Sequence, residues 1–272
     1  MKSSLNQDTL KKTTTDDVIR IAKSTGYDSI EFAQDKVEAI VADGGLNGLV
    51  QLLKDQGVGV ASVQGPEPFN LLSEYDFEMM TKRAKTLADV ARKTGTDTLV
   101  PVAAMVAKDS ISQEKILKSS AESLRRLAKV CGQDIRLGVE FLGFANCSIN
   151  TLDQAARLIE EVNLPNVGLT IDTFHMYISN SPASGLGRLG GPKTFLVHVN
   201  DSEPGDLGKL SDANRVFLGE GVIRLKDFRD ALVSSSYDGY ISLELLRPEY
   251  WEGDAEEVAR KGREGLRAIF GV

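Results

Sequence analysis

Cysteine is scarce in this sequence, with two among 272 residues. Cys131 and Cys147 lack the CxxC or ladder spacing of a thiolate metal site or a disulfide framework, which indicates two free, buried thiols. Clusters of Lys and Arg are also missing, and 32 basic residues against 39 acidic ones give a net charge of −7. Neither nucleic acid nor an anionic membrane is an expected partner of such a chain.

Long apolar runs are absent too. No run approaches the roughly 18 apolar residues of a membrane span, and the first residues, MKSSLNQDTLKKTTTDD, lack the apolar core of a signal peptide. No linker rich in Pro, Gly or Ser divides the chain, whose composition is 42% hydrophobic and 26% charged. We therefore expect a cytoplasmic protein with one domain over residues 1–272.

Short β-branched runs alternate with longer segments of helical period. The predicted strands are Lys2–Asn6, Tyr27–Phe32, Val58–Val63, Thr98–Val102, Arg136–Phe141, Val167–Asp172, Lys193–Asn200 and Tyr240–Leu245. The predicted helices are Thr15–Thr25, Leu46–Gln56, Asp76–Thr94, Ser112–Cys131, Leu152–Val162, Leu225–Ser234 and Asp254–Phe270. This alternation predicts an α/β fold, a single (β/α)8 TIM barrel. A doubly wound open sheet is the alternative, but no GxGxxG or GxxxxGK[ST] loop follows an early strand.

Both histidines lie between Val167 and Asp201, a stretch in which two predicted strands end. His175 follows Asp172 by three residues, and His198 precedes Asp201 by three. Two scarce imidazoles that each lie close to a carboxylate at a strand end indicate part of a metal site.

The last four predicted strands each carry an acid or imidazole near the C-terminal end: Glu140, Asp172, His198 and Glu244. Buried parallel strands are normally apolar, and the strand ends of a barrel converge on the face that holds the active site. Three converging carboxylates repel one another unless a cation compensates them. We expect one divalent ion, Mn²⁺ before Mg²⁺, Co²⁺, Zn²⁺ or Fe²⁺. The alternative, four separate ion pairs with Lys or Arg, requires the same coincidence on four consecutive strands.

Five segments resemble the sugar phosphate isomerase/epimerase family, a group of xylose isomerase-like TIM barrels. They are GVEFLG (138–143), LTIDTFHMY (169–177), VHVNDSE (197–203), RVFLGEGVI (215–223) and SLELLRPEYW (242–251). Within that family, the inosose (2-keto-myo-inositol) isomerases have the most similar D-x-F-H, N/D-D-x-E, D-x-x-R-V and E-L-x-R-P-E-Y segments. The resemblance is strong from Arg136 to Trp251 and only architectural before it.

The resemblance implies roles for individual residues. The family's metal ligands fall on Glu140, Asp172, His198 and Glu244, the residues already selected from the strand ends. Glu140 and Glu244 would also be the catalytic acid and base. His175 and Arg215 fall on substrate-binding positions, and Asp201 either binds substrate or orients His198.

The chemistry implied is proton transfer next to a carbonyl through a metal-stabilised enediolate. The leading hypothesis is an isomerase or epimerase of a keto-inositol or ketose, a small polyhydroxylated substrate of inositol or carbohydrate metabolism. A lyase of the same fold, such as 3-dehydroshikimate dehydratase, is the alternative, and a non-catalytic sugar-binding subunit is a third. A DNA repair enzyme similar to endonuclease IV needs three zinc ions and many histidines, which this sequence does not supply.

A few residues near strand ends have no assigned role. Glu31 could bind substrate or pair with a lysine, and Glu220 lies in a glycine-flanked turn. The segment Arg247–Trp251 could form a pocket wall or a contact in a homo-oligomer, because Tyr and Trp suit both places.

Overall fold

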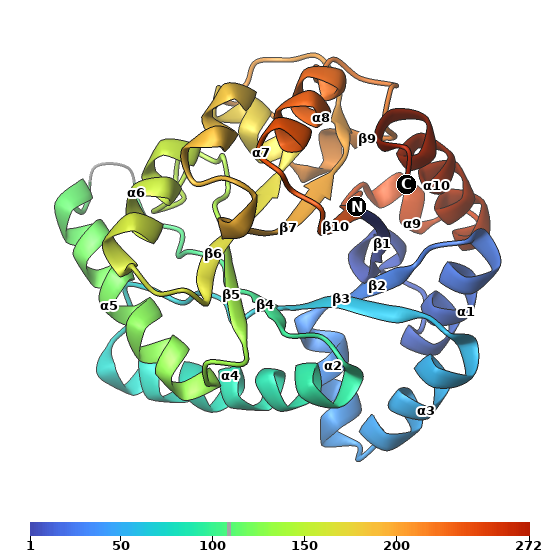
Figure 1. Cartoon of the computed structure of the whole chain (residues 1–272), viewed down its shortest axis with the longest axis horizontal. Coiled ribbons are helices and arrows are strands. Elements are labelled where there is room, and N and C mark those ends of the chain that lie inside the picture. Colours follow the sequence, from blue (N-terminus) through green and yellow to red (C-terminus); the bar gives the residue numbers. More distant parts are fainter. Residues whose placement is uncertain (108–109) are drawn as a thin grey trace.

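The protein is described by a computed structural model that covers residues 1–107 and 110–272. A closed barrel of parallel strands lies at the centre, surrounded by helices (Figure 1). Around the barrel the strands follow one another in the order β1 (Lys2–Asn6), β10 (Tyr240–Leu243), β7 (Thr194–Val199), β6 (Val167–Asp172), β5 (Arg136–Glu140), β4 (Thr98–Val100), β3 (Gly59–Gln64) and β2 (Ser29–Phe32). Because β1 pairs with both β2 and β10, the sheet has no free edge. The predicted (β/α)8 barrel is confirmed, and the open sheet is wrong.

Seven of the helices around the barrel begin and end close to the predicted residues. They are α1 (Thr15–Thr25), α3 (Leu46–Gln56), α4 (Glu74–Thr94), α5 (Gln113–Cys131), α6 (Leu152–Val162), α8 (Leu225–Ser234) and α10 (Ala255–Phe270). The structure adds α2 (Gln34–Ala42), α7 (Thr173–Ile178) and α9 (Pro248–Trp251). Local chemistry sets these bounds: the hydroxyls of Thr14, Ser73 and Ser112 accept backbone N–H groups at three helix starts. At the other end, Gly26 closes α1 in the left-handed conformation.

Three short helices, α2, α7 and α9, are absent from the sequence prediction. Helix α7 begins directly after β6, because the Asp172 carboxylate accepts the backbone N–H groups of Phe174 and His175 at 2.6 and 3.0 Å. Helix α9 begins with Pro248, a residue whose fixed φ suits the first helical position. Helices α7 and α9 are shorter than two turns, and α2, with nine residues, buries Val37 alone, so none of the three shows an apolar period that the sequence pattern would reveal.

Several predicted strands are longer than the observed ones. Strand β4 ends at Val100, and Pro101, which has no N–H to donate, follows it. Strand β10 ends at Leu243, so Glu244 lies just beyond the strand, although its backbone N–H still donates to the carbonyl oxygen of Val199 at 3.2 Å. The strand ends therefore remain aligned, and this alignment positions the polar side chains described below.

A continuous hydrophobic cluster packs the helices against the barrel and includes Ile30, Val139 and Leu266, all fully buried. Several strand positions instead carry small polar side chains with no solvent exposure, namely Ser4, Ser29, Ser62 and Ser242. Small side chains on the strands leave room for larger polar groups at the carboxyl end of the barrel. Among the described residues, no helix is long and apolar enough to cross a membrane.

Candidate metal centre and active site

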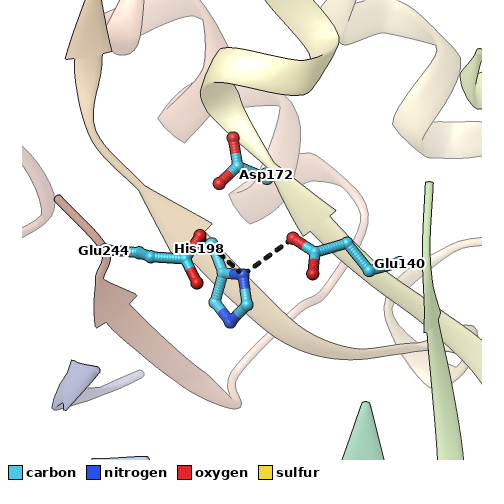
Figure 2. A group of neighbouring side chains, drawn as sticks. All are labelled: Glu140, Asp172, His198 and Glu244. Carbon is cyan, nitrogen blue, oxygen red and sulfur yellow. Dashed lines mark hydrogen bonds and ion pairs between the residues drawn. The ribbon is translucent and has the colours of Figure 1, made fainter. Parts of the chain in front are cut away.

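Four side chains from consecutive strand ends meet inside the barrel: Glu140, Asp172, His198 and Glu244 (Figure 2). One ligand atom from each residue lies within 4.8 Å of the ligand atoms of the other three. Asp172 and His198 are fully buried, and Glu140 and Glu244 are 5% and 3% exposed. The sequence prediction that these residues come together is therefore met by the structure.

The register of the barrel explains this convergence. Asp172 of β6 is the register partner of His198 of β7, and His198 is also the register partner of Ser242 on β10. Glu244 follows Ser242 by two residues, so its side chain points to the same face of the sheet. Glu140 ends β5 next to β6. Adjacent parallel strands thus deliver one ligand each near their carboxyl ends.

His198 lies at the centre of a set of carboxylates. Its Nδ1 is 2.9 Å from Glu140 Oε1 and 3.4 Å from Glu244 Oε2. On the other side of the ring, Nε2 is 2.9 Å from Glu31 Oε2. Burial alone lowers the pKa of His198, but Glu244, Glu31 and Glu140 raise it well above its usual range.

Arg215 brings a buried positive charge to the same place. It lies on β9 (Arg215–Val216), which pairs antiparallel with β8 (Asp201–Ser202). Its Nη1 donates to Asp172 Oδ2 at 2.6 Å and to Glu244 Oε2 at 3.0 Å. Burial disfavours a charged carboxylate, yet the positive charges of Arg215 and His198 hold the pKa of Asp172 below its usual range. The predicted Arg215 is therefore part of the site.

The imidazole of His175, on the first turn of α7, contacts Arg215 rather than the ligand side chains. Arg215 Nη2 lies 3.1 Å from His175 Nε2, and because a guanidinium only donates, Nε2 accepts and Nδ1 carries the proton. His175 Nδ1 is buried and has no hydrogen-bond partner within the described part of the chain. Burial lowers the pKa of His175, which favours the neutral ring. The imidazole is thus a neutral N–H donor.

Two amide side chains that the sequence analysis missed hold Glu244 in place. Asn6 Nδ2 and Gln64 Nε2 donate to Glu244 Oε1 at 2.9 and 3.1 Å. Burial raises the pKa of Glu244 well above its usual range, although His198 and Arg215 oppose this shift. Asn6 and Gln64 end β1 and β3, so the strand-end rule, extended from charged to amide side chains, predicts both positions.

A cavity of about 440 Å³ opens above the cluster. Glu140, Glu244, His175 and Arg215 line it, whereas Asp172 and His198 lie below its surface and do not. Two of the candidate ligands and two of the three predicted substrate contacts thus face the same space. A small polyhydroxylated molecule would fit a cavity of this size.

Asp201 does not face the cavity. Its Oδ1 accepts the backbone N–H groups of Ser202 and Ile223 at 2.9 and 2.8 Å, and its Oδ2 accepts that of Gly219 at 3.1 Å. A Cβ on Gly221 would lie 2.4 Å from Asp201 Oδ1, so the loop is closely wrapped around this carboxylate. The expectation that Asp201 binds substrate or orients His198 is corrected: it organises the loop that follows β9.

The other unassigned residues also lie away from the cavity lining. Glu220 forms an ion pair with Lys261 at 2.6 Å. Arg247 forms an ion pair with Glu203 at 2.7 Å, and the Trp251 indole N–H donates to a backbone carbonyl of η1 (Gln7–Leu10) at 2.9 Å. The contacts of Arg247 and Trp251 attach the segment after β10 to its neighbours.

The donor set suits one divalent cation. Three carboxylates and one imidazole nitrogen converge, a mostly hard set with room for further oxygen ligands. Including Glu31, four buried carboxylates surround a site in which Arg215 is the one permanently charged base among the described residues. Buried negative charge in excess is costly, and a divalent cation would compensate it.

Known proteins resemble this chain along nearly all of its length. A family model described as a xylose isomerase-like TIM barrel matches residues 19–269. An inosose isomerase of Bacillus velezensis is 30% identical over 253 residues, which are 92% of this chain and 90% of that protein. A 3-dehydroshikimate dehydratase of Pseudomonas aeruginosa is 28% identical over 250 residues, 91% of this chain but 38% of that protein.

One solved structure is also very similar. It is a crystal structure of the IOLI protein with a zinc atom, which matches with a TM-score of 0.95 at 27% identity and covers 100% of this chain and 98% of that one. The sequence and structural similarities agree with the closed barrel. The chain belongs to the xylose isomerase-like TIM barrel family.

Proposed function

We propose that the protein is a divalent-metal-dependent isomerase or epimerase of a keto-inositol or ketose, acting by proton transfer through an enediolate. The observation that carries this proposal is the convergence of Glu140, Asp172, His198 and Glu244 beneath one cavity. The similarity to inosose isomerases over about nine tenths of both chains supports an isomerase.

The two glutamates are the proposed acid and base. Glu140 and Glu244 lie on opposite sides of His198 (Figure 2), and both line the cavity. If a carbonyl compound is held between them, one carboxylate can remove the proton from the carbon beside the carbonyl. The other can return a proton to the opposite face of that carbon. When bound, a divalent ion would supply positive charge beside the carbonyl oxygen as the proton is removed. A positioned acid or base accelerates such a step about 10²–10⁴-fold.

His175 and Arg215 are the proposed substrate contacts. The His175 Nδ1–H is buried, unpaired in the described chain and held on a ring that lines the cavity. A substrate hydroxyl or carbonyl oxygen would satisfy this donor, since buried polar groups rarely remain without partners. Arg215 holds the imidazole in this orientation through Nε2 and keeps positive charge next to Glu244.

The charge of the cavity favours a neutral substrate. The acidic side chains in its lining are Asp8, Asp35, Glu38, Glu67, Glu140, Asp212 and Glu244. The basic ones among the described residues are Lys11, Arg83 and Arg215, of which Arg83 pairs with Glu38 at 2.8 Å and Arg215 pairs with Asp172 at 2.6 Å. The lining thus offers no excess of positive charge to a carboxylate or phosphate. This favours a keto-inositol or ketose over 3-dehydroshikimate, which carries a carboxylate.

The proposal also names the metal ion and the domain organisation. We propose Mn²⁺ as the preferred ion because three of the four donors are carboxylates, with Zn²⁺ supported by the zinc atom in the IOLI structure. Residues 1–272 would form one domain, because the closing helix α10 and the first strand belong to the same barrel.

Deuterium exchange tests the proposal. The protein with Mn²⁺ is incubated in D2O with an inosose, a ketohexose and 3-dehydroshikimate separately, and the products are followed by NMR. We expect deuterium on the carbon beside the carbonyl of the inosose or ketohexose, and no dehydration. Dehydration of 3-dehydroshikimate without exchange into the other substrates would show a lyase. Metal binding without exchange into any substrate would show a non-catalytic binding protein.

A further inference from the structure

A buried glutamate lies on the far side of the metal-binding histidine. Glu31 is in β2, is 0% exposed and contacts His198 of β7 across the interior of the barrel. Its Oε2 is 2.9 Å and its Oε1 3.1 Å from His198 Nε2. Ser242 of β10 donates its hydroxyl to Glu31 Oε2 at 3.0 Å. Three strands thus build one hydrogen-bonded arrangement below the candidate metal site.

Neither role considered from the sequence, substrate binding or an ion pair with a lysine, fits Glu31. Among the described residues, no lysine or arginine lies within ion-pair distance of it, and it is not part of the cavity lining. A fully buried carboxylate is costly unless it is paired and hydrogen-bonded. Its partners are an imidazole nitrogen and a hydroxyl, so the function of Glu31 has to act through His198.

The geometry determines what that function is. An ionised carboxylate only accepts hydrogen bonds, so Glu31 requires His198 Nε2 to carry a proton. Nδ1 also faces carboxylates, Glu140 at 2.9 Å and Glu244 at 3.4 Å, so it too carries a proton here (Figure 2). A metal ion held by these carboxylates would replace the Nδ1 proton and use the lone pair of that nitrogen, while Nε2 would keep its proton on Glu31. Two contacts from the carboxylate to the same nitrogen also restrict the rotation of the ring.

We propose that Glu31 is a positioning residue that selects the Nε2–H tautomer of His198 and presents Nδ1 to the metal ion. This inference rests on the proposed metal-dependent function. Carboxylates that accept the second N–H of a metal-binding imidazole strengthen binding, and their removal typically lowers metal affinity about 10–100-fold. Glu31 would act on metal affinity without touching the substrate.

The two histidines of the chain make the tautomer directly measurable. In protein labelled with ¹⁵N and loaded with Zn²⁺, the imidazole region of a long-range ¹H–¹⁵N spectrum contains two rings, His175 and His198. The variant His175→Phe assigns them. We expect a protonated Nε2 and a metal-bound Nδ1 on His198. A wild-type spectrum with Nδ1 protonated, or with Nε2 bound to zinc, would overturn the proposal without any Glu31 variant.

Zinc titrations measure the energetic consequence. We expect Glu31→Ala to bind Zn²⁺ about 10–100-fold more weakly than the wild type, and Glu31→Gln to recover part of the loss because its amide oxygen can still accept from Nε2. Ser29→Ala is the matched control: Ser29 is equally buried, lies two residues earlier on β2 and donates to the Ser3 carbonyl oxygen at 3.1 Å. It should lower stability without changing zinc affinity.

The outcomes separate this inference from the function on which it rests. Wild-type protein that binds no Zn²⁺ would contradict the metal site and Glu31's role together. Wild-type binding with an unchanged affinity in Glu31→Ala would contradict only the role of Glu31. If Glu31→Ala does not fold, Glu31→Gln decides the question: a partial loss of zinc affinity supports the role of Glu31, and an affinity equal to that of the wild type contradicts the role of its carboxylate.

Discussion

Arg215 and His175 form a hydrogen bond of 3.1 Å that fixes the protonation of a buried imidazole. Because Arg215 only donates, Nε2 of the neutral His175 ring accepts, and the ring proton is on Nδ1. His175→Phe removes this donor while keeping a ring between Phe144 and Phe174, whose edges pack around it. We expect kcat/KM to fall roughly 10- to 100-fold, the effect of losing a hydrogen bond to a polar or charged group. Zinc affinity should be unchanged, and a wild-type kcat/KM would remove His175 from substrate binding.

Glu244→Gln tests the acid and base assignment. The amide keeps the size of the side chain and still accepts from Asn6 and Gln64, but it cannot take up a proton. We expect deuterium exchange to fall by about 10²–10⁴-fold, with the fold and much of the metal affinity retained. Glu220→Gln, a change in a half-exposed glutamate paired with Lys261, is the control and should leave exchange unchanged. Full activity of the Glu244 variant would refute its catalytic role.

His198→Ala tests the link between metal and stability. A ligand that binds only the folded state stabilises it by about 2.7 kcal/mol at one hundred times its Kd. The wild type should therefore melt several degrees higher in excess Mn²⁺ than in EDTA, as measured by calorimetry. The variant should lose this difference, because it lacks one of four ligands. Identical melting of the wild type in both buffers would contradict the metal site.

Asp201→Ala tests the corrected role of this residue. The change leaves the backbone N–H groups of Ser202, Gly219 and Ile223 without their acceptor. We expect the free energy of unfolding in urea to fall by about 1–3 kcal/mol, with zinc affinity close to that of the wild type. Asp206→Ala, in an exposed part of the same connection, serves as control. A higher KM without loss of stability would instead restore the substrate contact.

Cys131 predicts a dependence of stability on alkaline pH. Burial raises the pKa of Cys131 from 9.0 to about 12, so the folded protein keeps the thiol protonated where the unfolded chain loses the proton. The stabilising contribution is complete below about pH 9 and decreases as pH rises towards 12. Urea unfolding at pH 8 and pH 10 should show a smaller pH effect in Cys131→Ala than in the wild type. An equal change in the free energy of unfolding between pH 8 and pH 10 in the two proteins would contradict the raised pKa of Cys131.

A thiol reagent provides a second measurement on the same residues. Burial also raises the pKa of Cys147, and both cysteines are free and buried. Neither should react with a disulfide reagent at pH 8 unless the protein unfolds, since the thiolate is the reactive form. Rapid labelling of the native protein would show that one of the two sites opens.

The sequence alone predicts the helices with long apolar periods and the four ligands at strand ends. Helices α1, α3, α6 and α8 have the predicted bounds, because capping residues and periodicity are properties of neighbours along the chain. The ligands could be predicted because acids in otherwise apolar strands are costly and therefore informative.

Only the tertiary structure shows which strand-end residues share a function. Asp201 and Glu31 look alike in sequence, because each is an acid at the end of an apolar run. In the structure, Asp201 accepts backbone N–H groups of the loop after β9, whereas Glu31 contacts His198. Barrel closure brings β2 and β7 into contact through the interior although 167 residues separate Glu31 from His198. Such contacts depend on strand order and register, which local sequence does not encode.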